Sequence, residues 1–401
     1  MSKTGRHRSR IVILGWYGSS NTGDEAVLQA VVQSLQASGY NDLNDLLVLS
    51  TEPQKTSAWL GVPSAPRGLT PGSIKALWGA KALVLGGGGL IQDSSSVYNL
   101  PIYALYVAIA RLRGLKVVAW GLGVGPLRTP LGRALARFIY SSAGYFSVRD
   151  EIAAMWLARL GVPPDKVMIT ADPAFLIRAE PVPPDSGGVS RIGFCIRHPV
   201  HDKPGLNLQY LLPVSLRHRL RIGGGDDGSK DEAFVFALAR AIRLCTEEIG
   251  AKVVLLPLWP GRDDEIIRRV EAKARELGVG EQAIEWAQVE PTPGAILNYI
   301  GNLDMLVSMR LHALIFAANK GVPVLALSYV GKVRGLMRML GQERWVIEVE
   351  TRTPSAEELE MKINLLWHDR AAQGQALKEA ARRAKARASQ DELRIASLLG
   401  E

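Results

Sequence analysis

The sequence predicts an α/β protein made of two parallel-sheet domains that face each other across a cleft. Short apolar runs alternate with helix-length amphipathic stretches, which is the pattern of a parallel sheet covered by helices on both faces. The 401 residues exceed one ordinary core, so two domains of about 150–200 residues are expected. A stretch rich in Pro, Gly and Ser at 179–190 separates two such series of elements and is predicted to be the linker.

The first series of elements occupies residues 11–178 and predicts the N-terminal domain. Each strand is followed by a glycine-rich or polar turn and then by a helix, beginning with IVILGWYGSSNTGDEAVLQAVVQSLQ. The same order recurs in ALVLGGGGLIQDSSSVYNLPIYALYVAIARLRG, KVVAWGLGVGPLRTPLGRALARFIY and YFSVRDEIAAMWLARLG, before VMITADPAF. Such turns lie at the carboxyl ends of parallel strands, where open α/β sheets bind ligands.

The second series occupies residues 191–353 and predicts a C-terminal domain of the same kind. It contains RIGFCIRHP, helices near 231–250 and 262–277, KVVLLPLWPG, AIEWA and the almost wholly apolar DMLVSMRLHALIFAANKGVPVLALSY. Residues 354–401 are helical in composition, and residues 1–10 form a basic tail. The expected architecture is two Rossmann-like halves across a cleft, which resembles the glycosyltransferase-B arrangement.

Composition restricts the classes of function. Hydrophobic residues make up 47% and charged residues 22%, as in an ordinary globular protein. The formal net charge is +9, but aromatic residues do not interleave with the basic ones, so nucleic acid is not the expected partner. An anionic substrate or an acidic membrane surface fits this charge. No apolar run reaches the roughly 20 residues that span a bilayer, and Cys195 and Cys245 lie in apolar contexts. With no secretory signal at the N-terminus, we expect a cytoplasmic protein.

The turn in GWYGSSNTGDEAVLQA leads from the first predicted strand into a helix that begins with two acids. Asn21 or Thr22 can cap this helix, and an acid in its first turn suits the helix dipole. Capping needs one acid only, so Asp24 followed by Glu25 leaves one carboxylate for another task. Asp24 is therefore either a first-turn acid or a group in the cleft that carries a proton or orients a hydroxyl. Gly23 frees the backbone beside it.

Four consecutive glycines, residues 86–89, follow the predicted strand ALVL. A loop of this kind allows close approach of a phosphate or a sugar and supplies backbone N–H groups. Gly87 and Gly88, with Gln92 and Asp93 beyond them, are therefore candidates to face the acceptor or a phosphate. The loop lacks the G-x-G-x-x-G spacing of a dinucleotide fingerprint, so a tight turn explains it equally well. No metal site is expected, because no His, Cys or acid cluster has a ligand spacing.

Several cations occur where a predicted strand meets a helix. Arg149 ends a short strand before two acids, and it either pairs with one of them or reaches an anionic ligand. Arg310 and His312 interrupt an apolar stretch, where a charge moved out of water needs a partner. A lone histidine there is more often a satisfied core residue, but the neighbouring arginine favours an anion site. Lys332 opens the next helix, where a cation opposes the helix dipole unless an anion lies nearby.

The sequence resembles the bacterial polysaccharide pyruvyl transferases, which form pyruvate ketals on cell-wall or exopolysaccharide sugars. The resemblance runs in order through GWYGSSNTGDEAVLQA, GGGGLIQD, GLGVGP, SVRDE, TADPAF and RLHALIFAANKGVPVLALSY, over most of residues 11–340. NTGDEA and RLHALI are its most specific segments. Where the family tends to have Asp-Pro before the lysine, this chain has Val330 and Gly331.

The resemblance implies a glycosyltransferase-B-like fold and phosphoenolpyruvate as the donor, with no separate cofactor. It implies that the N-terminal domain faces the acceptor, a sugar or a lipid-linked glycan, and that the C-terminal domain faces the donor. Asp24 and His312 would then be catalytic, in an acid–base assignment that the residues leave open, and Arg149, Arg310 and Lys332 would bind the donor. A lipid-linked acceptor would bring the protein to the periphery of the inner membrane, with the basic tail as one contact.

Two other functions agree with parts of the pattern. A nucleotide-sugar-dependent glycosyltransferase has the same two-domain architecture and uses a cleft, glycine loops and cations for a diphosphate. A non-catalytic protein that binds nucleic acid or a membrane surface would use the basic charge alone. Release of phosphate from phosphoenolpyruvate, release of a nucleotide, and salt-dependent binding of DNA distinguish the three.

Overall fold

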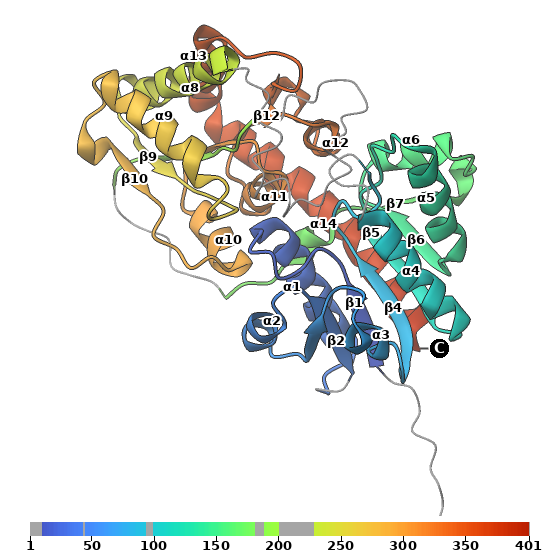
Figure 1. Cartoon of the computed structure of the whole chain (residues 1–401). Helices are drawn as coiled ribbons and strands as arrows, with labels where there is room; N and C mark the ends of the chain where they lie inside the picture. Colours follow the sequence, from blue (N-terminus) through green and yellow to red (C-terminus); the bar gives the residue numbers. More distant parts are fainter. Residues whose placement is uncertain (1–9, 43–44, 94–98, 181–187, 200–227, 401) are drawn as a thin grey trace, which may run out of the picture.

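The computed structural model describes residues 10–42, 45–93, 99–180, 188–199 and 228–400, and it contains two sheets (Figure 1). The seven-stranded sheet has the order β3-β2-β1-β4-β5-β6-β7, and the six-stranded sheet has the order β10-β9-β8-β11-β12-β13. All the pairings in the described strands are parallel. The predicted α/β class is therefore confirmed. Most of the basic tail and the middle of the linker lie outside the described residues.

The N-terminal sheet alternates with helices, as predicted. Its strands are β1 (Arg10–Leu14), β2 (Leu46–Ser50), β3 (Ser64–Pro66), β4 (Ala80–Gly86), β5 (Lys116–Leu122), β6 (Tyr145–Val148) and β7 (Met168–Ile169). Its helices are α1 (Thr22–Ala37), α2 (Pro53–Leu60), α3 (Pro71–Lys75), α4 (Asn99–Leu112), α5 (Pro130–Ser142) and α6 (Glu151–Arg159). The strand order reverses between β1 and β4, so their carboxyl ends open a crevice of the kind that binds ligands in α/β sheets.

The second sheet repeats this plan. Its strands are β8 (Arg191–Cys195), β9 (Lys252–Leu255), β10 (Ile284–Trp286), β11 (Met305–Ser308), β12 (Val324–Ser328) and β13 (Val346–Glu348). The helices around it are α8 (Gly228–Arg243), α9 (Asp264–Glu276), α10 (Pro293–Gly301), α11 (Leu311–Lys320), α12 (Gly331–Met339) and α13 (Ala356–His368). Here the order reverses between β8 and β11, so a second ligand crevice is expected at their carboxyl ends.

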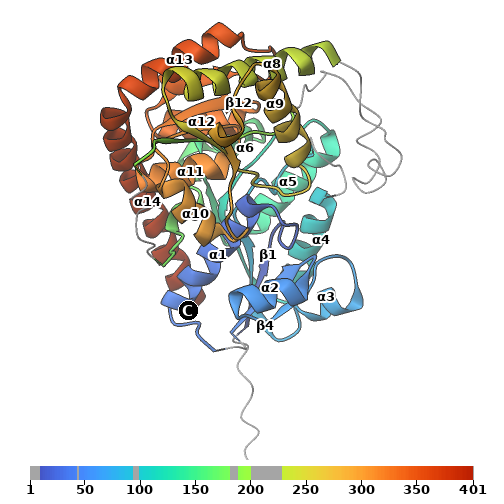
Figure 2. The ribbon, with the colours of Figure 1, turned by 90° about the vertical axis from the view of Figure 1, so that its left-hand side faces the viewer.

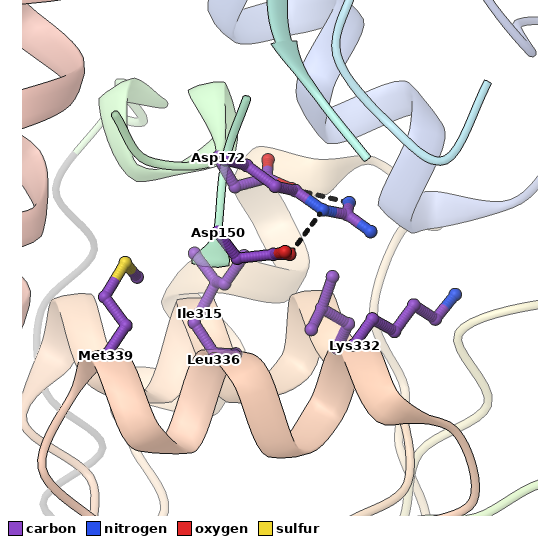
Figure 3. A pocket seen from close by; sticks show the side chains of 8 residues that line it. Asp150, Asp172, Ile315, Lys332, Leu336 and Met339 are labelled. Atoms are coloured by element: carbon purple, nitrogen blue, oxygen red, sulfur yellow. Dashed lines mark hydrogen bonds and ion pairs between the residues drawn. The ribbon is translucent and has the colours of Figure 1, made fainter. Parts of the chain in front are cut away.

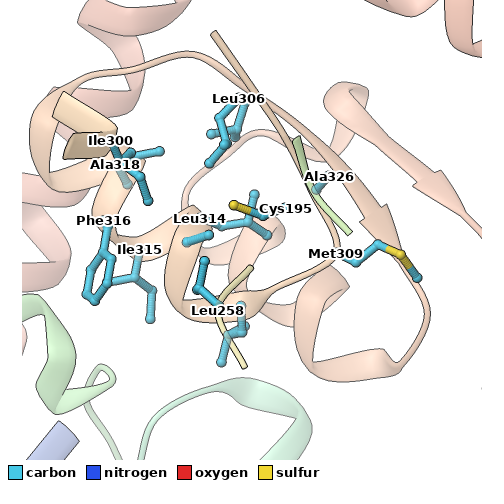
Figure 4. Packing of buried hydrophobic residues seen from close by; sticks show 14 of the residues in the cluster. Cys195, Leu258, Ile300, Leu306, Met309, Leu314, Ile315, Phe316, Ala318 and Ala326 are labelled. Atoms are coloured by element: carbon cyan, nitrogen blue, oxygen red, sulfur yellow. The ribbon is translucent and has the colours of Figure 1, made fainter. Parts of the chain in front are cut away.

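The core of the second domain lies between β8, β11 and β12 and the helix α11. Figure 4 shows Leu306 of β11 and Ala326 of β12 near Cys195, with Leu314 and Phe316 of α11 packed beside them, and all five are fully buried. This burial explains the near-continuous apolar run of the sequence, because a parallel strand covered on both faces has no polar side. Arg310 and His312 lie shortly after the end of β11, so the packed core fixes the backbone from which their side chains extend.

The last helix, α14 (Arg370–Gly400), crosses back from the second domain to the N-terminal sheet (Figure 2). Near its end, the carbonyl of Leu398 accepts a hydrogen bond from Lys116 Nζ at 2.8 Å. The buried carboxylate of Asp391 accepts hydrogen bonds from Ser147 Oγ at 2.7 Å and Thr170 Oγ1 at 3.2 Å. The helix that the sequence predicts at 354–401 therefore includes a segment that ties the two domains together.

The N-terminus of α1 forms part of the junction between the domains. Thr22 N donates to the carbonyl of Leu258 at 3.0 Å, and the indole Nε1 of Trp259 donates to the carbonyl of Ser19 at 3.0 Å. Both Leu258 and Trp259 lie in the loop after β9. The carboxyl ends of the central strands of the two sheets consequently face the same junction.

Candidate functional site

The two acids in the first turn of α1, Asp24 and Glu25, have different hydrogen-bond partners. Asn21 caps the helix, since its side chain accepts from Gly23 N at 3.3 Å, and its Nδ2 donates to Asp24 Oδ2 at 2.5 Å. Glu25 accepts from the backbone N–H of Gly18 at 2.8 Å and so fixes the preceding loop. Asp24 is left on the side of the junction.

His312 lies in the first turn of α11 and packs against α1 of the other domain. A β-carbon added to Gly23 would lie 2.8 Å from the imidazole Cε1, so only glycine leaves room for the ring. The Nε2 atom of His312 is buried, has no hydrogen-bond partner among the described residues, and lies 3.7 Å from Asp172 Oδ2. A buried nitrogen without a partner costs about 1–3 kcal/mol, which a ligand could recover.

Burial, together with the positive charges of Arg149, Lys332 and Arg310, lowers the pKa of His312 to about 4, although Asp172 acts in the opposite direction. The imidazole is therefore neutral near pH 7 in the free protein. Because part of this shift comes from neighbouring positive charge, an anion bound beside those cations would raise the pKa again.

Arg149 directly follows β6 and is held between two carboxylates. Its Nη1 donates to Asp172 Oδ2 at 3.0 Å and its Nε to Asp150 Oδ2 at 3.3 Å, and all three residues are buried. Asp172 also caps the 3₁₀ turn Pro173–Leu176 by accepting from Ala174 N at 3.0 Å. One carboxylate thus positions Arg149 of the first domain and approaches the imidazole of the second.

Arg310 has a partner of its own. Its Nε donates to Asp263 Oδ2 at 3.0 Å and its Nη2 to Asp263 Oδ1, with Arg310 8% and Asp263 1% exposed. Asp263 also accepts from the backbone N–H groups of Leu258 and Trp259. The buried cation therefore holds the loop after β9 in place, and much of its charge is neutralised before any ligand binds.

Lys332 lies in the first turn of α12 with an exposed side chain. Figure 3 shows it on the same helix as Leu336 and Met339, opposite Asp150 and Asp172. A narrow pocket lies between helices α11 and α12 and the segments that follow β6 and β7. It is lined by Arg149, Asp150, Asp172, Leu311, Ile315, Lys332, Leu336 and Met339. Lys332 is the only one of the three predicted donor cations with no carboxylate partner in the described part of the chain.

Asp24 lies close enough to these groups to respond to their charge. Burial raises the pKa of Asp24 to about 6, although Lys332, the hydrogen bond from Asn21 and Arg149 act in the opposite direction. A carboxylic acid with this pKa exchanges its proton near neutral pH, as a general acid or base must. Gly88 borders it, because a β-carbon there would lie 3.3 Å from Asp24 Oδ1.

The glycine loop is placed only in part as the sequence suggests. Gly87 and Gly88 have positive φ values of 59° and 74°, which explains the need for glycine at the tip of β4. Asp93 needs correction, because it is buried and accepts from Arg128 N at 2.7 Å and Thr129 N at 2.8 Å. Its carboxylate is buried and supports the loop before α5, instead of lying at the surface of the glycine loop. Gln92 precedes it in the same loop.

The structure thus brings Asp24, Arg149, His312 and Lys332 together at the junction and adds Asp172 to them. Arg310 is adjacent but paired. Sequence reasoning missed Asp172, although TADPAF places an Asp-Pro turn directly after a predicted strand. It also missed Asp263, whose pairing with Arg310 across 47 positions no local pattern indicates.

No three His, Cys, Asp or Glu side chains of the described residues are grouped as metal ligands. None of the helices in that part of the chain combines the length and the apolar character needed to cross a bilayer.

Comparison with known proteins relates this arrangement to a family and to a fold. The family model described as "Polysaccharide pyruvyl transferase" matches residues 21–330. The amylovoran biosynthesis protein AmsJ of Erwinia amylovora is 22% identical over 284 residues, which are 67% of this chain. The match spans 62% of the length of AmsJ.

Solved structures with 11–13% identity resemble the whole chain in fold. A glycosyltransferase from Rickettsia africae has a TM-score of 0.61, with 98% of this chain and 99% of that chain covered and 11% identity. HepE of Anabaena in complex with UDP has a TM-score of 0.59 at 13% identity, with 98% and 99% covered. The UDP-GlcNAc 2-epimerase of Neisseria meningitidis has a TM-score of 0.55 at 11% identity, with 98% and 100% covered. The expected glycosyltransferase-B-like architecture is confirmed.

Proposed function

Because the chain belongs to the polysaccharide pyruvyl transferase family, and is therefore a transferase, we propose that phosphoenolpyruvate is its donor. The pyruvyl group passes to two hydroxyls of a sugar in a cell-wall or exopolysaccharide precursor, which gives a pyruvate ketal and inorganic phosphate. The observation that carries this proposal is the convergence of Asp24 from one domain with His312 and Lys332 from the other at one junction. The relative AmsJ, named for amylovoran biosynthesis, supports a biosynthetic role.

The reaction needs proton transfer and no change of oxidation state. A proton adds to the methylene carbon of the donor, and a first sugar hydroxyl forms a bond to the neighbouring carbon as it loses its own proton. A second hydroxyl then bonds to the same carbon, its proton leaves, and the bond to the phosphate oxygen breaks. The two hydroxyl protons balance the proton added to the methyl group and the one taken by the released phosphate.

We assign Asp24 to the acceptor hydroxyl and His312 to the methylene carbon. Asp24 lies in the N-terminal domain beside the glycine loop, and its pKa of about 6 leaves most of it as a carboxylate base at pH 7. His312 is neutral in the free protein, but the donor's charge beside Arg149 and Lys332 raises its pKa, so that it takes up a proton when the donor binds. Asp172 holds Arg149, and its Oδ2 lies 3.7 Å from the imidazole Nε2.

The test is release of inorganic phosphate from phosphoenolpyruvate with a panel of acceptors that includes lipid-linked glycans. Phosphoenolpyruvate is a cytoplasmic metabolite, so we propose that the reaction takes place in the cytoplasm. His312→Ala should lower turnover by roughly 10²–10⁴-fold. Release of UDP from a sugar nucleotide, with no response to phosphoenolpyruvate, would instead identify a glycosyltransferase.

A further inference from the structure

The two arginines nearest the reacting groups cannot by themselves hold a phosphate dianion. Arg149 is paired with Asp150 and Asp172, and Arg310 is paired with Asp263. Two cations thus face three buried carboxylates, which leaves no surplus of positive charge. A donor with a carboxylate and a phosphate needs additional cations that are not already neutralised.

Such cations lie next to Lys332, at the carboxyl ends of β8 and β9. Arg197, two residues beyond β8, donates from Nη1 to the hydroxyl of Tyr329 at 2.9 Å, and its Cζ lies 4.4 Å from the centre of that ring. Arg262, in the loop after β9, stacks on Trp259 at 4.2 Å. Neither arginine pairs with a carboxylate of any described residue. Lys332 Nζ is 6.0 Å from the same Tyr329 ring, so Lys332 and Arg197 border one region. Arg262 shares the Trp259 ring with Arg310, whose Cζ is 5.8 Å from its centre, and so lies on the side of this region toward Arg310.

The titration of neighbouring groups agrees with this excess of positive charge. Burial raises the pKa of Tyr329, yet Lys332, Arg197 and Arg310 together lower it to about 7. Burial lowers the pKa of Arg262, and Arg197 and Arg310 lower it further. Like charges held close together in this way gain from a bound anion.

We propose that Arg197, Arg262 and Lys332 form a phosphoryl site that holds the phosphate of the donor. The site lies at the crevice where the order of the second sheet reverses between β8 and β11, which is where open α/β sheets bind ligands. Lys332 joins it to His312 and Asp24, so the phosphate would lie on one side of Lys332 and the methylene carbon on the other. This assignment rests on the proposed function.

Binding of phosphoenolpyruvate, inorganic phosphate, pyrophosphate and pyruvate to Arg197→Gln and Arg262→Gln tests the assignment by calorimetry. Arg334→Gln is the matched control, since Arg334 lies on α12 with Lys332 but pairs with Glu348. We expect Arg197→Gln to bind phosphoenolpyruvate and phosphate at least about tenfold more weakly, with pyruvate affinity and the control unchanged. Arg262→Gln, at an exposed position, should show a smaller loss of the same kind.

Unchanged affinity for phosphate in both variants would overturn the phosphoryl site, but it would not contradict the proposed transferase function. Loss of pyrophosphate affinity with unchanged phosphoenolpyruvate affinity would also overturn it, because the cations would then serve an acceptor diphosphate. If the wild-type protein released no phosphate from phosphoenolpyruvate with any acceptor, the proposed function itself would fail. Circular dichroism of each variant separates loss of binding from loss of folding.

The outer face of α4 and α5 carries exposed apolar side chains. Both helices lie on the same face of the N-terminal sheet, because β4, β5 and β6 follow one another in one direction (Figure 1). Each helix exposes two apolar side chains seven positions apart, which places them on one side of the helix. Their exposed fractions are 40% for Leu105, 88% for Leu112, 62% for Leu131 and 36% for Phe138.

The charges on the segment that contains these two helices have one sign. The sequence contains no Asp or Glu from residue 94 to residue 149, whereas it contains seven Lys or Arg residues there. Exposed Arg111, Arg133 and Arg137 accompany the apolar side chains on α4 and α5. A second copy of the chain would bring like charges together on this face, whereas an anionic surface would complement it.

We infer that this α4–α5 face docks on the surface of a bilayer that contains anionic phospholipid. Apolar side chains would enter the boundary between headgroups and acyl chains while arginines contact phosphates, as in other interfacial helices. Such docking would bring the junction of the two domains close to lipid-linked acceptors. It needs no helix that spans the bilayer.

Co-sedimentation with phosphatidylglycerol and with phosphatidylcholine vesicles tests the docking face. We expect the wild type to prefer phosphatidylglycerol, and Leu112→Asp with Phe138→Asp to weaken this binding at least about tenfold, since charge is costly in the acyl region. The matched control is Met361→Asp with Leu365→Asp on α13, where both side chains are similarly exposed. Equal binding by the two double variants would overturn the inference. So would a dimer in light scattering that only the α4–α5 variant abolishes.

Discussion

Gly23→Ala tests whether His312 must lie where the structure places it. Gly23 is the second residue of α1 and has no positive φ, so its backbone conformation suits alanine. The added β-carbon would lie 2.8 and 2.9 Å from the imidazole atoms Cε1 and Cγ, and closer still to Nδ1. The imidazole must therefore leave its present position, in which Nε2 lies 3.7 Å from Asp172 Oδ2.

The magnitudes separate activity from stability. Alanine is favoured over glycine within a helix by up to about 1 kcal/mol. Moving His312 off its rotamer costs about 0.5–1.5 kcal/mol. These terms nearly cancel, so the free energy of unfolding of Gly23→Ala should remain within about 1 kcal/mol of the wild type. Turnover should fall by roughly 10²–10⁴-fold, because a displaced imidazole no longer transfers its proton.

The assay is steady-state phosphate release from phosphoenolpyruvate, with urea unfolding of the same samples. Gly72→Ala is the matched control, because Gly72 is the second residue of α3 and its added β-carbon would meet only Thr70 Oγ1, at 3.8 Å. The control should keep full turnover. Full turnover by a correctly folded Gly23→Ala protein would refute the role given to the position of His312.

Three further substitutions have outcomes that the structure sets. Asp24→Asn should abolish turnover and raise the free energy of unfolding at pH 8 by up to about 3 kcal/mol. The pKa of Asp24 is about 6 in the folded protein and 3.8 ordinarily, so the wild type loses stability as the pH rises between these two values. Urea unfolding at pH 5 and pH 8 checks this, and an equal difference at both pH values would contradict it. Asp391→Ala should lower the free energy of unfolding in urea by about 3 kcal/mol, because the hydroxyls of Ser147 and Thr170 lose their buried hydrogen-bond acceptor. An unchanged unfolding midpoint would show that α14 is held by apolar packing alone. Arg310→Ala should destabilise the fold by about 3–5 kcal/mol, because Asp263 is left buried and unpaired, and Arg310→Ala with Asp263→Asn should recover part of this loss; no recovery in the double variant would reject the pairing.

The fold could be predicted because its determinants are local. Apolar runs, glycine-rich turns and amphipathic stretches each span few residues, and their alternation limits the topology to parallel sheets. The division of labour between Asp24 and Glu25 could also be anticipated, since a helix start needs one acid. Here the structure shows which of the two holds the preceding loop.

The pairings within the site could not be predicted, because they join distant elements. Asp172, in the turn after β7, contacts Arg149, which follows β6, and approaches His312 of the other domain. Asp391 reaches Ser147 over 244 positions, after α14 has crossed between the domains. Asp93 shows the same limit, since a polar residue beside a glycine loop was expected at the surface of that loop, whereas it is buried and accepts from Thr129 N of a neighbouring loop.

Single-turnover reaction in deuterated water tests the proposed chemistry most directly. If the donor is phosphoenolpyruvate and the proton adds to its methylene carbon, the product ketal will carry a methyl group with one deuterium, formed together with one equivalent of phosphate. Mass spectrometry of the pyruvylated sugar measures both the ketal and the label. A ketal whose methyl group carries no deuterium, or phosphate release without any ketal, would contradict the mechanism.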